Sequence, residues 1–399
     1  MMPQVVRHDL DAWPVHAPAC LGPATLVLAD GRVFRGLGFG ARATAVGEVV
    51  FNTAMSGYQE IVTDPSYTGQ LVCLTVAEVG NVGVNVDDEE SRGHGSAGLI
   101  VRSLAPAPSN YRATGDLPAY LAARGMPGIT ELDTRALTRH LRERGAMRVG
   151  ISTTELDPTN LLAKVLEQPE MAGANLVADV TIGAENIVRP EGKPRHVVAA
   201  IDLGIKDMTP KRMAERGLEV HVLPASTTLA DIQKIGADGV FFSNGPGDPS
   251  TADTEVALLR DVLDAGLPYF GICFGNQIFG RALGFGTYKL KYGHRGINQP
   301  VMDLTTRKVE ITAHNHGFAV DAPRDETVDT RWGDVTVSHV CLNDDVIEGL
   351  ELRGKDGRLR AFSVQYHPEA AAGPHDSAYL FDRFVEMLDA ATDEKQGAL

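Results

Sequence analysis

The chain has 399 residues, of which 43% are hydrophobic and 22% are charged, a composition typical of a globular protein with more than one domain. Its formal net charge of −15 argues against a nucleic-acid partner or an anionic membrane surface, because both would repel it. No apolar run is long enough to span a membrane, and residues 1–10 contain no apolar signal core, so we expect a cytoplasmic protein without a membrane partner.

The cysteines of the chain are few and scattered. None of the four belongs to a Cys-x-x-Cys pair, so the sequence predicts neither a disulfide framework nor a metal site. We expect reduced thiols, in keeping with a reducing compartment. The cysteines are Cys20, Cys73, Cys273 and Cys341.

Residues 25–34 predict a β-hairpin near the start of the chain. Two short apolar runs are joined there by Asp30-Gly31, a dipeptide that favours tight hairpin turns. Further strands are expected at 47–52 and 70–76. The early part of the chain is therefore rich in strands.

Helices are expected later in the same half. Residues 129–145 carry leucines at helical spacing and end in a glycine suited to a C-cap. A second helix is expected over residues 159–167. Residues 1–194 thus predict a mixed β/α domain, of which the first twenty or so residues are an extension.

A change of pattern follows residues 183–195, which concentrate glycine, proline and charge and predict a linker to a second domain over 195–393. Beyond it, strands alternate with helices, which predicts an α/β domain with a mainly parallel sheet and its chemistry at the carboxyl ends of the strands. Strands are expected at 196–202, 218–223, 239–243 and 268–272, and helices at 209–216, 228–235, 254–265 and 276–283.

Cys273 lies at the turn between the last of these strands and the helix after it, within the sequence Gly-Ile-Cys-Phe-Gly-Asn-Gln of residues 271–277. At such an elbow the glycines relieve clashes around a strained residue, and the N-terminus of the following helix favours a thiolate. Most free cysteines are small buried hydrophobic residues, so the elbow alone leaves a structural role open.

A second motif, His367-Pro-Glu369, ends an alternating, strand-like run over residues 362–370. A cysteine nucleophile needs an imidazole that takes up and returns its proton, and the imidazole needs a third group that fixes its tautomer. Taken alone, His-Pro-Glu is more often a surface turn. Together with the elbow, it predicts a catalytic triad of Cys273, His367 and Glu369.

These motifs resemble those of class I, triad-type glutamine amidotransferases, and more narrowly the small subunit of carbamoyl-phosphate synthase. The resemblance extends from about residue 24 to about residue 388 and implies a flavodoxin-like amidotransferase domain behind a family-specific N-terminal domain. The stretches that carry the narrower resemblance are residues 51–67, 80–85, 243–249, 291–300 and 313–320.

The resemblance also implies the residues of the substrate site. The backbone of Gly247 and Phe274 would form an oxyanion hole, and Ser66 would bring the first domain to the substrate of the second. Many relatives carry histidine at the position of Asn276 and leucine at that of Phe274, departures that leave the triad unchanged. The implied glutamine-binding residues are Ser66, Gly245, Gly247, Phe274, Gln277, Asn315, Gly317 and Phe318.

By the same resemblance, the chain would hydrolyse L-glutamine through a cysteine thioester and deliver ammonia to a large subunit that makes carbamoyl phosphate from bicarbonate, for arginine and pyrimidine synthesis. The sequence contains no Gly-x-x-x-x-Gly-Lys-Ser/Thr loop for ATP phosphates. ATP and Mg²⁺ are therefore expected on the large subunit, with no cofactor in this chain. The assembly would be a heterodimer or a higher oligomer, with the first domain as the docking surface.

Three alternatives remain open at this stage. A glutaminase subunit of another synthetase, such as one making anthranilate or GMP, shares the triad but lacks the stretch at residues 63–67. A cysteine peptidase or other Cys-His hydrolase would cleave peptides irrespective of glutamine. A non-catalytic scaffold could keep the fold, although the presence of all three triad residues argues against it.

Overall fold

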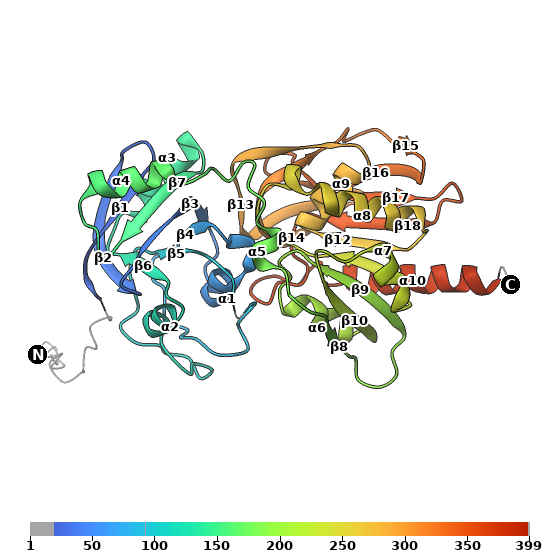
Figure 1. Cartoon of the computed structure of the whole chain (residues 1–399), viewed down its shortest axis with the longest axis horizontal. Helices are drawn as coiled ribbons and strands as arrows, with labels where there is room; N and C mark the ends of the chain where they lie inside the picture. The colour runs from blue at the N-terminus through green and yellow to red at the C-terminus, as the bar shows by residue number, and fades with distance from the viewer. Residues whose placement is uncertain (1–19, 92, 398–399) are drawn as a thin grey trace, which may run out of the picture.

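The computed structural model describes residues 20–91 and 93–397, which form two domains side by side (Figure 1). The expected N-terminal extension lies almost wholly outside the described residues. Within those two ranges, no helix combines the length and the apolar character needed to cross a membrane.

Seven strands of the first domain close into a barrel in the order β1-β2-β6-β5-β4-β3-β7. The expected hairpin is confirmed, because β1 and β2 pair antiparallel and the turn contains Gly31 at a φ of 86°. Closure of the barrel leaves no strand edge unpaired. The strands are β1 (Gly22–Leu28), β2 (Val33–Gly40), β3 (Thr44–Asn52), β4 (Gln70–Leu74), β5 (Gly98–Ile100), β6 (Pro127–Thr130) and β7 (Met147–Ser152).

The helices of this domain differ in one respect from the sequence-based expectation. The helix expected from residue 129 begins only at Thr134, because residues 127–130 form strand β6 and the Asp133 side chain caps the helix by accepting from the Ala136 N–H. The helix expected over 159–167 is confirmed. The helices are α1 (Tyr58–Thr63), the 3₁₀ turn η2 (Pro65–Tyr67), α2 (Leu117–Ala123), α3 (Thr134–Arg144), α4 (Pro158–Glu167) and α5 (Val177–Val180).

The second domain is built on an eleven-stranded sheet whose parallel part has the order β10-β9-β11-β12-β18, the flavodoxin-like order. The remaining strands extend the sheet by antiparallel pairing. The strands are β8 (Asn186–Val188), β9 (His196–Asp202), β10 (Leu218–Pro224), β11 (Gly239–Phe242), β12 (Tyr269–Ile272), β13 (Gly286–Asp303), β14 (Lys308–Asp321), β15 (Val328–Thr330), β16 (Gly333–Cys341), β17 (Ile347–Arg353) and β18 (Leu359–Val364).

Helices cover both faces of the parallel part. Along β9, Val198 and Ala200 belong to the core on the α10 side, whereas Ala199 and Ile201 belong to the core beneath α8 and α9. Successive residues of a strand point to opposite faces, so the apolar middle of this strand is buried on both faces of the sheet. The helices are α6 (Met208–Ala214), α7 (Leu229–Lys234), the 3₁₀ turn η3 (Pro249–Thr251), α8 (Asp253–Asp264), α9 (Phe274–Ala282) and α10 (Leu380–Gly397).

The expected alternation of strands and helices is confirmed from β9 to α9, but two features were not anticipated. Most of the antiparallel strands of the sheet lie within residues 286–353, where we did not expect any particular element. The linker expected over residues 183–195 is not wholly irregular, because Asn186–Val188 within it forms strand β8. This strand pairs antiparallel with β10, with Ile187 opposite His221, and extends the sheet by one strand.

The two domains meet along β13 and β3 (Figure 1). The Thr53 N–H of the first domain donates to the Arg295 carbonyl of the second at 3.2 Å, and Lys289 pairs with Glu48. Asn244 of the second domain donates to the Ser66 hydroxyl of the first domain at 2.9 Å. Residues of both domains therefore surround the carboxyl ends of the parallel strands.

Candidate active site

Cys273 sits at a strained elbow directly between β12 and α9. Its φ of 54° and ψ of −98° lie outside the regular regions, a geometry that costs energy and is concentrated at functional sites. The flanking glycines are required by close approach: a Cβ at Gly275 would clash with the Phe242 carbonyl oxygen, and one at Gly271 with the Tyr269 hydroxyl. The two glycines of the motif therefore allow the backbone geometry that places the Cys273 side chain at the elbow.

His367 and Glu369, three and five residues beyond the end of β18, face one another. Nδ1 of His367 lies 2.7 Å from the Glu369 carboxylate, and since a carboxylate only accepts, Nδ1–H donates. Nε2 of the neutral ring is then unprotonated. This buried atom has no hydrogen-bond partner among the described residues, and it can therefore take up a proton.

Asn315 lies beside the thiol and lines both cavities of the site. The sulfur of Cys273 lies 3.6 Å from the Asn315 carbonyl oxygen. Asn315 lines the cavity that contains Cys273 and also the adjoining cavity lined by His367. No hydrogen bond joins the Cys273 sulfur to His367 within the described chain, and in enzymes without substrate such bonds are often long and tighten when substrate binds.

The pKa of the Cys273 thiol is raised in this site, opposite to the lowering expected from the helix N-terminus. Burial raises the pKa of Cys273, and the Asp64 carboxylate raises it further. Lys206 and the Phe274 N–H at the start of α9 lower the pKa, but burial outweighs them. The helix N-terminus therefore acts in the expected direction without deciding the outcome, and ionisation requires a base.

A buried lysine holds the acidic groups of the site together. Nζ of Lys206 lies 3.3 Å from Glu369, 3.5 Å from Asp64 and 3.2 Å from Nδ1 of His367. Burial lowers its pKa, but the Asp64 and Glu369 carboxylates raise the pKa by more than burial lowers it, so the ammonium stays charged. Burial alone would raise the pKa of Glu369, but His367 and Lys206 hold it well below its usual range.

All eight residues expected to bind glutamine line one cavity together with Cys273. Gly247, with a φ of 96°, and Phe274, at the N-terminus of α9, lie on its wall, as an oxyanion hole requires. Residues of the cavity that sequence reasoning did not identify are Glu48, Gln70, Met171, Pro246, Arg295 and His316.

The amide groups of the cavity are already committed wholly or partly on their nitrogen side. Gln277 donates from Nε2 to the Phe318 carbonyl at 2.9 Å, and Asn315 donates from Nδ2 to Asp64 at 3.0 Å. Gln277 also donates to Gln365 at 3.1 Å, so both of its amide hydrogens are used, whereas Asn315 uses only one of its two on Asp64. The oxygens of both amides can accept hydrogen bonds from the ammonium group of an amino acid.

Arg295 brings a positive charge to the same cavity. The residue is buried, and its Nη1 donates to the Tyr292 carbonyl at 2.9 Å, whereas its Nε has no partner among the described residues. A buried guanidinium with an unused donor is suited to a carboxylate ligand. Its only signal in the sequence is its position within the stretch 291–300.

Asn276 does not line the cavity that contains Cys273. The fully buried side chain donates to Gln365 at 3.1 Å and accepts from the Ser363 hydroxyl at 2.8 Å. These bonds tie α9 to β18 beneath the elbow. The residue therefore supports the site from behind.

Two family models match the chain in succession. Residues 26–151 match the model described as carbamoyl-phosphate synthase small chain, CPSase domain, and residues 199–387 match glutamine amidotransferase class-I. The carbamoyl phosphate synthase small chain of Streptomyces coelicolor is 61% identical over 369 residues, covering 92% of this chain and 96% of the relative. The small chain of Bifidobacterium longum is 55% identical, with 92% and 94% covered, and that of Mycobacterium tuberculosis strain H37Rv is 54% identical, with 92% and 99% covered.

Proposed function

The chain belongs to the family of carbamoyl phosphate synthase small chains, the glutaminase subunits of the glutamine-hydrolysing synthase, and from the geometry around Cys273 we propose how it releases ammonia from L-glutamine. The observation that carries this proposal is the convergence of eight expected ligand residues from both domains on the single cavity that contains the strained cysteine.

The first step is attack by the sulfur on the side-chain carboxamide carbon of glutamine. Because the pKa of the thiol is raised, Nε2 of His367 removes its proton as the bond forms. Glu369 stabilises the resulting imidazolium through the bond to Nδ1. The pairing with Lys206 keeps the carboxylate ionised for this task.

The oxygen of the tetrahedral intermediate is stabilised by the backbone N–H groups of Gly247 and Phe274, each contributing on the order of 3 kcal/mol to the transition state. His367 then donates its proton to the departing ammonia, which leaves a thioester on Cys273. Water activated by the same imidazole hydrolyses the thioester and releases glutamate. These steps use only side chains and backbone of this chain.

Substrate orientation follows from the charges of the cavity. The amide oxygens of Gln277 and Asn315 accept from the α-ammonium group, and Arg295 offers a counter-charge to the α-carboxylate. Ser66, held by Asn244, adds a hydroxyl from the first domain. A substrate bound in this way bridges both domains.

The ammonia must reach a partner before water protonates it. The family implies a large subunit, and we place ATP and Mg²⁺ there, in a cytoplasmic heterodimer or higher oligomer that supplies carbamoyl phosphate for arginine and pyrimidine synthesis. The first domain remains the proposed docking surface. Co-purification of the chain from its native lysate tests this assembly: recovery of a large ATP-dependent subunit supports it, and recovery of an anthranilate or GMP synthetase subunit contradicts it.

The proposed chemistry is tested by trapping the thioester. The purified chain is mixed with glutamine, quenched in acid and digested, and the peptide containing Cys273 is weighed by mass spectrometry. A glutamyl adduct on Cys273 that forms as fast as glutamate appears supports the mechanism. Glutamate release without such an adduct, or peptide hydrolysis that glutamine does not inhibit, would overturn it.

A further inference from the structure

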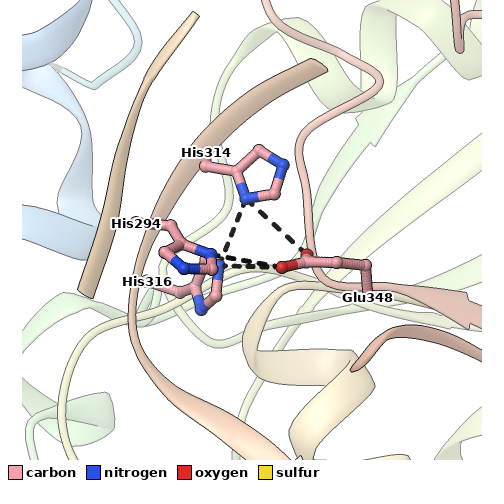
Figure 2. A group of neighbouring side chains, drawn as sticks. All are labelled: His294, His314, His316 and Glu348. Carbon is pink, nitrogen blue, oxygen red and sulfur yellow. Dashed lines mark hydrogen bonds and ion pairs between the residues drawn. The ribbon is translucent and has the colours of Figure 1, made fainter. Parts of the chain in front are cut away.

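Behind the glutamine cavity, three histidines and a glutamate converge on one point (Figure 2). His294 comes from β13, His314 and His316 from β14, and Glu348 from β17. All four side chains are buried, with relative exposures of 8%, 3%, 3% and 0%. None of them has a role in the glutaminase steps described above.

The facing atoms of this cluster all lie within 4.8 Å of one another. Nδ1 of His314 lies 3.2 Å from Nε2 of His316, and each of these nitrogens lies 3.6 Å from a Glu348 oxygen. Nδ1 of His294 lies 3.3 Å from Glu348. Ligands at 2.0–2.1 Å from a tetrahedral metal ion are themselves about 3.3 Å apart.

The outward-facing nitrogens of two of the rings are fixed by other groups. Nδ1 of His316 contacts the Phe318 carbonyl at 2.9 Å, and since a carbonyl only accepts, this nitrogen carries the proton. Nε2 of His294 lies 2.7 Å from the Asp344 carboxylate and is protonated for the same reason. A histidine that binds a metal usually donates its other N–H to a carbonyl or carboxylate in this way.

The tautomer of His314 follows from Thr312. The single hydroxyl proton of Thr312 is donated to the Gln299 carbonyl at 2.9 Å, so its oxygen can only accept from Nε2 of His314, 2.7 Å away. Nδ1 of neutral His314 is therefore unprotonated, like Nε2 of His316. Two lone pairs then face each other at 3.2 Å, beside a carboxylate oxygen of Glu348 that is buried without a partner.

Two lone pairs that face each other beside an unpartnered carboxylate oxygen call for a cation. We propose that His294, His314, His316 and Glu348 bind one zinc ion. Three imidazole nitrogens and one carboxylate oxygen suit zinc, and four protein ligands in a buried setting make a closed, structural site rather than a catalytic one. The alternative occupant of the same space is a proton shared between the histidines.

A metal at this place would fix the backbone on both sides of the substrate. His316 and His314 flank Asn315, whose carbonyl contacts the Cys273 sulfur, and His294 adjoins Arg295. Glu348 accepts through its carbonyl oxygen from the Gln365 N–H at 2.8 Å, two residues before His367. The ion would thus hold β13, β14 and β17 in register behind the cavity.

The test measures zinc in the full-length, tag-free chain. The protein is reconstituted with zinc, washed with a mild chelator and analysed for metal by mass spectrometry. We expect close to one zinc per chain in the wild type and at least about a tenfold lower content in Glu348→Gln and His314→Gln. The control His140→Gln removes a histidine that pairs with Asp30 at 2.6 Å outside the cluster, and it should keep the wild-type content.

A wild-type chain that holds no zinc after reconstitution would overturn the proposal, as would both ligand variants retaining as much as the control. Should the variants fail to fold, crystals of the wild-type chain decide the question. Anomalous scattering at the zinc absorption edge would then show a peak among the four side chains, and a map without such a peak would contradict the site. Neither readout depends on glutaminase activity.

Discussion

The side-chain amide of Asn315 in the second domain donates a 3.0 Å hydrogen bond to the carboxylate of Asp64 in the first. The carbonyl oxygen of the same asparagine lies 3.6 Å from the Cys273 sulfur. Asn315 therefore contacts both the barrel domain and the nucleophile. The position of the barrel domain influences both the geometry and the ionisation of the thiol.

Two substitutions of Asp64 separate these effects. Asp64→Asn removes the charge that raises the pKa of Cys273 but keeps an oxygen that accepts from Asn315. Its Cys273 should be alkylated by iodoacetamide faster than the wild-type cysteine at pH 8, as followed by mass spectrometry of that peptide. Asp64→Ala also removes the hydrogen bond, so the KM for glutamine should rise about tenfold. Identical behaviour of the two variants would contradict this division.

The elbow tolerates no side chain at Gly275. In Gly275→Ala the new methyl group would clash with the Phe242 carbonyl, and the start of α9 would have to move together with the Phe274 N–H. We expect kcat for glutamine hydrolysis to fall at least about tenfold and the free energy of unfolding to fall by about 1–3 kcal/mol. The matched control is Gly183→Ala, where nothing lies within 4 Å, and it should change neither quantity.

Glu90 makes the stability of the chain depend on pH. Burial raises its pKa from the ordinary 4.5 to about 7, against the opposing effect of Lys206. Since the folded chain keeps this proton at a higher pH than the unfolded chain, the free energy of unfolding falls as the pH rises from about 4.5 to about 7. The loss is on the order of 3 kcal/mol.

Glu90→Gln cannot ionise and should lose less stability over this interval. Urea unfolding at pH 5 and pH 8 compares the wild type, Glu90→Gln and Glu326→Gln, the last at an exposed position. The stability advantage of Glu90→Gln over the wild type should grow between the two pH values, and that of Glu326→Gln should stay constant. A constant difference for Glu90→Gln would show that this carboxyl is not the source.

Local signals were sufficient for the elements that carry the nucleophile. The boundaries of β9 agree with the expected 196–202, and α9 begins directly after Cys273, because alternating apolar runs and glycine turns are properties of short segments. Barrel closure could not be foreseen, since pairing of β1 with β7 joins strands more than a hundred residues apart. Long-range pairing leaves no mark in local spacing.

The site residues that the sequence did not reveal also depend on contacts between distant parts of the chain. Asp64, Lys206 and Arg295 become important only because the domains meet, and burial outweighs the expected effect of the helix N-terminus on the pKa of the Cys273 thiol. The prediction of no metal site rested on the absence of a Cys-x-x-Cys pair, and that pattern says nothing about histidine ligands. His314 and His316, two apart on a strand, share one face and were the available signal.

The central claim is that the Cys273 thiol serves glutamine hydrolysis alone. Carbamoyl phosphate formation by Cys273→Ser in complex with the large subunit should be measured with glutamine and, separately, with ammonium chloride as nitrogen donor. We predict that glutamine-dependent synthesis is lost, while ammonia-dependent synthesis stays at the wild-type rate. Equal loss of both activities, or retention of both, would contradict the account.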